Sequence, residues 1–190
     1  MNYLNTGGSF VKFYKYKNQL LIFYLAVGFF VGILYENIVS RRYGLSIDIF
    51  QTYFLQQYKQ TEIVAEKYLG YVMKARVVPL MGLCVLACVK WKKLLAIVNV
   101  CWTGFLAGVF MVSAVMQLGM KGILFCVVAM FPHIICYGLA YGILLSYLYR
   151  YPKASWNHAK TVFVVLVMFA GVLLETYFNP ILVKLVIRIM

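Results

Sequence analysis

The sequence contains five apolar runs separated by segments that carry basic residues, and these runs limit the folds that the chain can adopt. A helix needs about 20 apolar residues to cross a bilayer. In hydrocarbon every backbone N–H and C=O group must be paired within the protein, so only helices and closed barrels span a membrane. The runs are continuous and do not alternate with a period of two, which favours helices. The sequence therefore predicts an all-α, polytopic integral membrane helical bundle.

The composition agrees with this interpretation, because 64% of the residues are apolar and only 12% are charged. Soluble domains usually have roughly 45–50% apolar and about 25% charged residues. The formal net charge of +13 would also suit a nucleic-acid-binding protein. Here, however, the basic residues lie between the apolar runs, where they would meet lipid headgroups. We therefore expect membrane lipids as partners, and no nucleic acid.

We expect a single transmembrane domain over residues 1–190. Its first 18 residues form a basic, aromatic N-terminal tail. The second apolar run is short, which suits a tilted or re-entrant element. Pro132 should kink the fourth span. Asn179 and Pro180 should end the fifth, and the apolar tail after them either completes that span or lies along the interface. The expected spans are residues 19–39, 76–89, 94–118, 122–149 and 161–178.

Five spans place the two termini on opposite sides of the membrane. With a cytoplasmic N-terminus, most of the basic residues between spans also become cytoplasmic, as the positive-inside rule requires. Basic residues in and beside residues 40–75 conflict with this choice, although that segment is long and carries acids of its own. We expect the N-terminus to be cytoplasmic. The basic residues that support this orientation are Lys12, Lys15, Lys17, Lys90, Lys92, Lys93, Arg150, Lys153 and Lys160.

Residues 40–75 form the largest polar region and predict an amphipathic, extracytoplasmic segment. Ser46 and Asp48 are typical of a helix start. From Ile47 to Tyr68, apolar residues recur at spacings of three and four. Such a helix could lie on the membrane surface, dock a partner or pack on its own bundle. The candidate docking residues are Phe50, Phe54, Tyr58, Lys59, Glu62 and Lys67.

Two acids, Glu36 and Glu175, lie within or near the ends of spans, where ionisable residues are functional candidates by default. Each follows a glycine by four residues, at Gly32 and at Gly171. This similarity could reflect two helices that pack symmetrically, or chance. We favour a paired structural role for both acids over a proton relay. The expected partners are His133, Lys74 and Arg76.

Other polar and small residues in the spans add further candidates. His133 follows Pro132, and with no second histidine or acid at ligand spacing we favour a bond to a carbonyl or carboxylate over metal binding. Asn99 should face protein, because an unpaired amide in lipid is costly. Three pairs of glycines, each four residues apart, would allow helices to approach closely. These pairs are Gly28 and Gly32, Gly104 and Gly108, and Gly138 and Gly142.

The sequence shows no constellation typical of an enzyme. The five cysteines lie inside apolar runs, which indicates small buried side chains rather than reactive thiolates or a disulfide framework. A glycine-rich phosphate loop, a His-x-x-x-His pair and a Ser-His-Asp arrangement are all lacking. We therefore expect no catalytic residues, no cofactor and no metal.

Several short motifs are spread along most of the chain, namely residues 32–37, Gly104 and Gly108, Pro132 and His133, residues 171–175, and Asn179 with Pro180. In their order and spacing, these motifs resemble those of the stage II sporulation protein M family. One departure is that Ile134 and Tyr137 stand where the family would carry a glycine and an acid.

The resemblance implies a membrane scaffold of five to six spans that anchors and localises peptidoglycan hydrolases during forespore engulfment in sporulation. The implied partners are a lytic transglycosylase and an amidase-endopeptidase, which carry their own catalytic residues. The alternative is a permease subunit of a transporter, since Pro132, His133 and Asn99 offer the broken helix and midplane polar groups of that class. A third possibility is a lipid-interacting element built on residues 1–18. Any of these could form an oligomer.

Overall fold

The structure, a computed structural model, describes residues 6–43, 51–61, 64–86 and 91–189. Every regular element in these ranges is a helix, which confirms the all-α prediction. The helices are α1 (Thr6–Tyr43), α2 (Thr52–Gln60), α3 (Ala65–Leu86), α4 (Lys92–Leu118), α5 (Met120–Met130), α6 (His133–Arg150), α7 (His158–Leu173), the π-helical turn η2 (Leu174–Phe178) and α8 (Asn179–Ile189).

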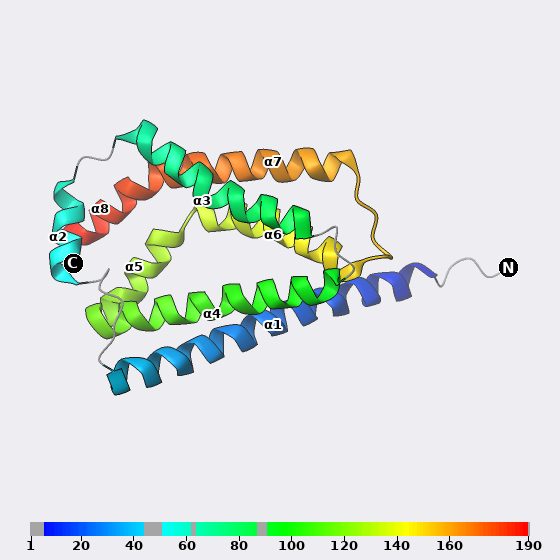
Figure 1. Cartoon of the computed structure of the whole chain (residues 1–190), viewed down its shortest axis with the longest axis horizontal. Coiled ribbons are helices and arrows are strands. Elements are labelled where there is room, and N and C mark those ends of the chain that lie inside the picture. The colour runs from blue at the N-terminus through cyan, green and yellow to red at the C-terminus, as the bar shows by residue number, and fades with distance from the viewer. Residues whose placement is uncertain (1–5, 44–50, 62–63, 87–90, 190) are drawn as a thin grey trace.

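Among the residues that the structure describes, four helical stretches are long and apolar enough to cross a membrane, namely Gln19–Ser40, Ala65–Val85, Lys92–Leu118 and His158–Ile189. The helices α5 and α6 make a fifth crossing if they are taken together, with a bend of 64° between them at Pro132. Figure 1 shows these segments running back and forth, with the two ends of the chain at opposite ends of the bundle. The chain is a multi-pass membrane protein, with four or five spans in the part that the structure describes.

The second span is longer than the sequence predicted, because α3 begins at Ala65 and has 22 residues. Its first turns carry Tyr68, Leu69 and Val72, which pack in a buried cluster with α6 and α7. The expected amphipathic helix is therefore divided. Within its described residues, Thr52–Gln60 forms the separate helix α2, and the residues of the expected helix from Ala65 onward belong to α3. The proposed helix start at Ser46 and Asp48 lies outside the described residues.

The helix α1 begins at Thr6, and the part of it that could cross a membrane is Gln19–Ser40, close to the span predicted at residues 19–39. One further prediction about a boundary was wrong, because Pro180 does not end the fifth span. The fifth span continues past Pro180 into α8. In the π-helical turn before this proline, the Asn179 N–H donates to the Leu174 carbonyl. Proline lacks an N–H and its ring clashes with the carbonyl of a regular helical turn, so a wider turn lets the helix continue.

The helices α1 and α4 lie side by side and run parallel (Figure 1). Four glycines bring their backbones together, because a Cβ at any of them would meet a main-chain oxygen of the other helix. This contact confirms the close approach predicted from two of the glycine pairs. The third pair, Gly138 and Gly142, has open space around it. The contacts are Gly28 to Cys101, Gly32 to Phe105, Gly104 to Leu25 and Gly108 to Phe29.

Candidate functional site

An ion pair between a partly exposed arginine and a buried glutamate connects α3 to the π-helical turn η2. The Arg76 Nε donates to Glu175 Oε2 at 2.8 Å, and its Nη2 lies 2.5 Å from Oε1. Planar guanidinium and carboxylate groups match in this two-bond geometry. The Glu175 side chain is 10% exposed and the Arg76 side chain 40%. Of the three partners predicted for the buried acids, Arg76 is thus the one that binds Glu175.

Tyr137 of α6 completes this site. Its hydroxyl donates to Glu175 Oε2 at 2.6 Å, and the Arg76 guanidinium carbon lies 5.0 Å from the centre of its ring. Gly171 makes room for it, because a Cβ there would meet the ring. The Tyr141 hydroxyl also donates to the Arg76 carbonyl at 3.3 Å. Arg76, Tyr137 and Glu175 are called the Glu175 cluster below.

The Glu175 cluster holds a carboxylate with three donor groups from two other helices. An unpaired charge at this depth in lipid would cost about 3 kcal/mol or more. Pairing cancels the net charge, and the Tyr137 hydroxyl satisfies a further lone pair. The cluster therefore fixes α3, α6 and the α7–α8 span relative to one another.

His133 begins α6 immediately after the bend and lies beside the Glu175 cluster. Its ring stands edge-on to that of Tyr137, with centroids 5.7 Å apart. The residue is 6% exposed, yet its Nδ1 has no hydrogen-bond partner. The bond to a carbonyl or carboxylate that the sequence predicted is therefore not made by this nitrogen. Tyr137 was not predicted as a partner for the acids, although it lies one helical turn after His133, which puts both residues on one face of α6.

The second buried acid, Glu36, has a different neighbour. The hydroxyl of Ser113 in α4 lies 2.8 Å from Glu36 Oε1 and 2.9 Å from the Val109 carbonyl, so its single proton serves two acceptors. Glu36 is only 4% exposed. Neither the predicted histidine nor the predicted basic residues bind it in the contacts described, and it does not pair with Glu175.

The remaining candidates lie apart from the Glu175 cluster. At Asn99, the described contact is between the Thr103 hydroxyl and the Asn99 carbonyl, at 2.6 Å, and does not involve the side-chain amide. Among the candidate docking residues, Phe54 and Lys59 on α2 and Lys67 on α3 are exposed. Tyr58 instead packs against the bundle, and burial raises the pKa of its phenol. Phe50 and Glu62 lie outside the described residues.

Within the described ranges, no three His, Cys, Asp or Glu side chains are grouped so that they could hold a metal ion. The site is therefore an ion-pair cluster. Together, the fold and the site define the class of the protein as a multi-pass helical membrane protein. Comparison with known proteins adds no narrower assignment: no family model, curated protein or solved structure matches the chain.

Proposed function

We propose that the protein is a non-catalytic membrane scaffold that anchors and localises peptidoglycan hydrolases during forespore engulfment. The proposal starts from the resemblance to the stage II sporulation protein M family. The structural observation that supports it best is the position of α2, a short helix with one face fixed to the bundle and the other exposed. The partners would be a lytic transglycosylase and an amidase-endopeptidase.

The inner face of α2 is held in place by two kinds of contact. Leu55 and Tyr58 pack against the buried cluster formed by α4, α5 and α8. At the end of α2, the Lys184 Nζ of α8 donates to the Thr61 carbonyl at 2.7 Å. A helix fixed in this way loses little further freedom when a partner binds, which favours affinity.

The outer face of α2 combines aromatic rings with positive charge. Tyr53 is 71% exposed and Phe54 is 50% exposed, and Lys59 is exposed as well. Exposed aromatic residues are enriched among those that contribute most to protein–protein binding. This face is therefore a docking surface for a hydrolase domain, and we call it the α2 face.

The α2 face lies at the end of the bundle away from the N-terminus (Figure 1). If the N-terminus is cytoplasmic, as the positive-inside rule favours, the α2 face is on the outer side, next to the cell wall. The Glu175 cluster also contributes, because it fixes α3, the helix that follows α2. Tethering at this face would raise the effective concentration of the hydrolases at the wall.

The test is co-purification from sporulating cells with the tagged, full-length protein. We expect Phe54→Ala combined with Lys59→Glu to abolish co-purification of both hydrolases, while the variant still inserts in the membrane. Phe163→Ala combined with Lys93→Glu is the matched control, since it makes the same two changes at exposed residues of α7 and α4, which are not part of the α2 face. Unchanged recovery of the hydrolases with the double variant would exclude the α2 face as their docking surface.

A permease subunit is the second candidate, and one observation favours it. The fourth span is broken at Pro132, and the break places the unbonded Nδ1 of His133 beside an ion pair. Broken helices with buried polar groups are typical of transporters. The same purification separates the two candidates, because a permease would bring down an ATPase subunit in place of the hydrolases.

A further inference from the structure

A hollow of about 400 Å³ lies where α4 begins and α6 ends, at the other end of the bundle from the α2 face. Its walls come from two chain segments that follow spans, so it lies at the depth of the lipid headgroups. It is lined by Trp91, Lys92, Lys93, Leu94, Tyr151 and Pro152. We call it the α4–α6 hollow.

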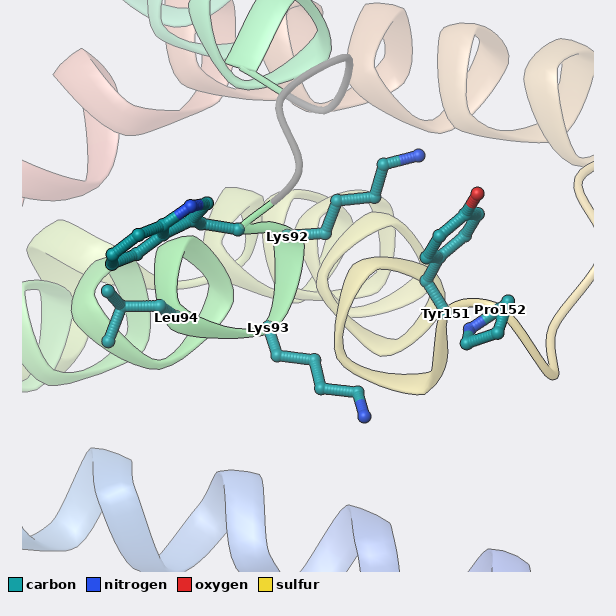
Figure 2. A pocket seen from close by; sticks show the side chains of 6 residues that line it. Lys92, Lys93, Leu94, Tyr151 and Pro152 are labelled. Carbon is teal, nitrogen blue, oxygen red and sulfur yellow. The ribbon is translucent and has the colours of Figure 1, made fainter.

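Two lysines set the charge of the α4–α6 hollow. Figure 2 shows the Lys92 side chain extending toward Tyr151 and the Lys93 side chain projecting to the other side of α4. The Lys92 Nζ lies 3.7 Å from the centre of the Tyr151 ring, which fixes this charge by a cation–π contact. Lys93 is exposed. An anion between α4 and Tyr151 would therefore meet the charge of Lys92 directly, while Lys93, which also lines the hollow, adds to the positive potential there.

No acid competes for these two charges from the chain segments that form the hollow. The sequence has no Asp or Glu between Glu66 and Glu175, and Glu175 is bonded to Arg76. In the segment that follows α6, the Lys160 Nζ donates to the Ser155 carbonyl at 2.6 Å. Lys92 and Lys93 thus form a positive site whose counter-ion has to come from outside these segments.

The walls of the hollow indicate what that counter-ion is. Trp91 is 67% exposed and Leu94 is 50% exposed, so the site offers apolar surface next to its charges. Tryptophan and tyrosine favour the membrane interface, and basic pockets between membrane helices bind anionic headgroups. We infer that the α4–α6 hollow binds the phosphate of an anionic phospholipid, with Lys92 contacting the phosphate, Lys93 attracting it at longer range, and the apolar wall contacting the glycerol and first acyl carbons.

The test uses the full-length protein in a neutral detergent at low salt, with soluble short-chain lipids as probes. We expect dihexanoyl phosphatidylglycerol to bind, and to bind more tightly than dihexanoyl phosphatidylcholine. Lys92→Gln with Lys93→Gln should weaken binding by about 30-fold, since each lysine near a headgroup contributes about 1 kcal/mol. Lys59→Gln with Lys67→Gln removes the same charge at the far end of the bundle and should change binding less than about twofold.

Two further measurements separate this site from general charge and from free phosphate. Tyr151→Ala keeps both lysines but releases Lys92, and should weaken lipid binding by about threefold. Tyr151→Ala also replaces the double lysine variant as the test if that variant is not monodisperse on size exclusion. Equal losses in the two lysine pairs, equal binding of the zwitterionic lipid, or no effect of Tyr151→Ala would each overturn the proposal. Inorganic phosphate that binds as tightly as the lipid would show that the ligand is a free phosphate instead.

Discussion

Glu36 and Glu175 each follow a glycine by four residues on a membrane-spanning helix, but their neighbours differ. Gly32 lies against the backbone of α4, and Glu36 next to it meets one neutral hydroxyl, that of Ser113. Gly171 lies against the Tyr137 ring, and Glu175 meets that residue's hydroxyl together with a guanidinium group. In both places the glycine lets the neighbouring helix approach, and the acid then bonds to that helix.

This comparison shows that one local pattern serves two kinds of helix contact. At the α1–α4 contact, four glycines place backbone against backbone, so most of the attraction comes from van der Waals packing over a long, close surface. At the Glu175 cluster, the attraction comes from a few directional bonds among three spans. The two acids therefore do not mark a symmetric pair of helices, since each helix packs on a different neighbour.

The two contacts also differ in what they can tolerate. A packed contact loses energy gradually as side chains change size. A buried ion pair is different, because removing one partner leaves an unpaired charge, whereas replacing both by apolar residues is often neutral. The Glu175 cluster should thus respond to single and double substitutions in opposite ways, and the α1–α4 contact should not.

The largest effect is expected from Arg76→Met. The substitution leaves Glu175 buried without its charged partner and should lower the free energy of unfolding by about 3–5 kcal/mol. Thermal unfolding of the purified protein in detergent measures this loss. Arg76→Met combined with Glu175→Met should recover most of it, because no unpaired charge remains. A double variant as unstable as Arg76→Met alone would show that the ion pair itself, and not the unpaired charge, carries the stability.

The α1–α4 contact is tested by Gly104→Leu. The added side chain would meet the Leu25 carbonyl, which is main chain and cannot rotate away. We expect a loss of about 2–3 kcal/mol, near the upper end for overpacking. Gly138→Leu is the matched control, since a Cβ there meets open space. Similar melting temperatures for the two variants in detergent would contradict the close contact between α1 and α4.

Much of this fold follows from the sequence because lipid imposes strong rules. Five apolar runs predict the spans, and the glycine spacing predicts the close contact that α1 and α4 make. The boundaries at Ala65 and Pro180 were mispredicted, since the amphipathic pattern merges into the apolar run of α3 and a π-helical turn accommodates the proline. Hydropathy alone does not mark either event.

The partners of the two acids were harder to predict than the spans. Arg76 was one of three candidate partners for Glu175, with Lys74 and His133. Which of the two α3 residues reaches the acid depends on how α3 is rotated about its axis. Ser113 and Tyr137 were not proposed as partners. Each lies far from its acid in the sequence, and periodicity does not show which spans are neighbours.

The smallest effects come from removing one hydroxyl from each site, which compares the two acids directly. Ser113→Ala removes the donor to Glu36, and we expect a loss of about 0.6 kcal/mol, the average for hydrogen bonds between membrane helices. Tyr137→Phe removes the donor to Glu175, which the structure pairs with Arg76. Bonds to charged groups are stronger, so we expect a loss of about 1.5 kcal/mol.

Both losses are measured as shifts in thermal unfolding in the same detergent, and an exposed tyrosine provides the control. Tyr53→Phe removes a hydroxyl from an exposed ring on α2 and should leave stability unchanged. The order of the three variants matters more than the individual values. A larger loss for Ser113→Ala than for Tyr137→Phe would mean that Glu36 is the more strongly held acid, and the distinction between a packed contact and a bonded cluster would then fail.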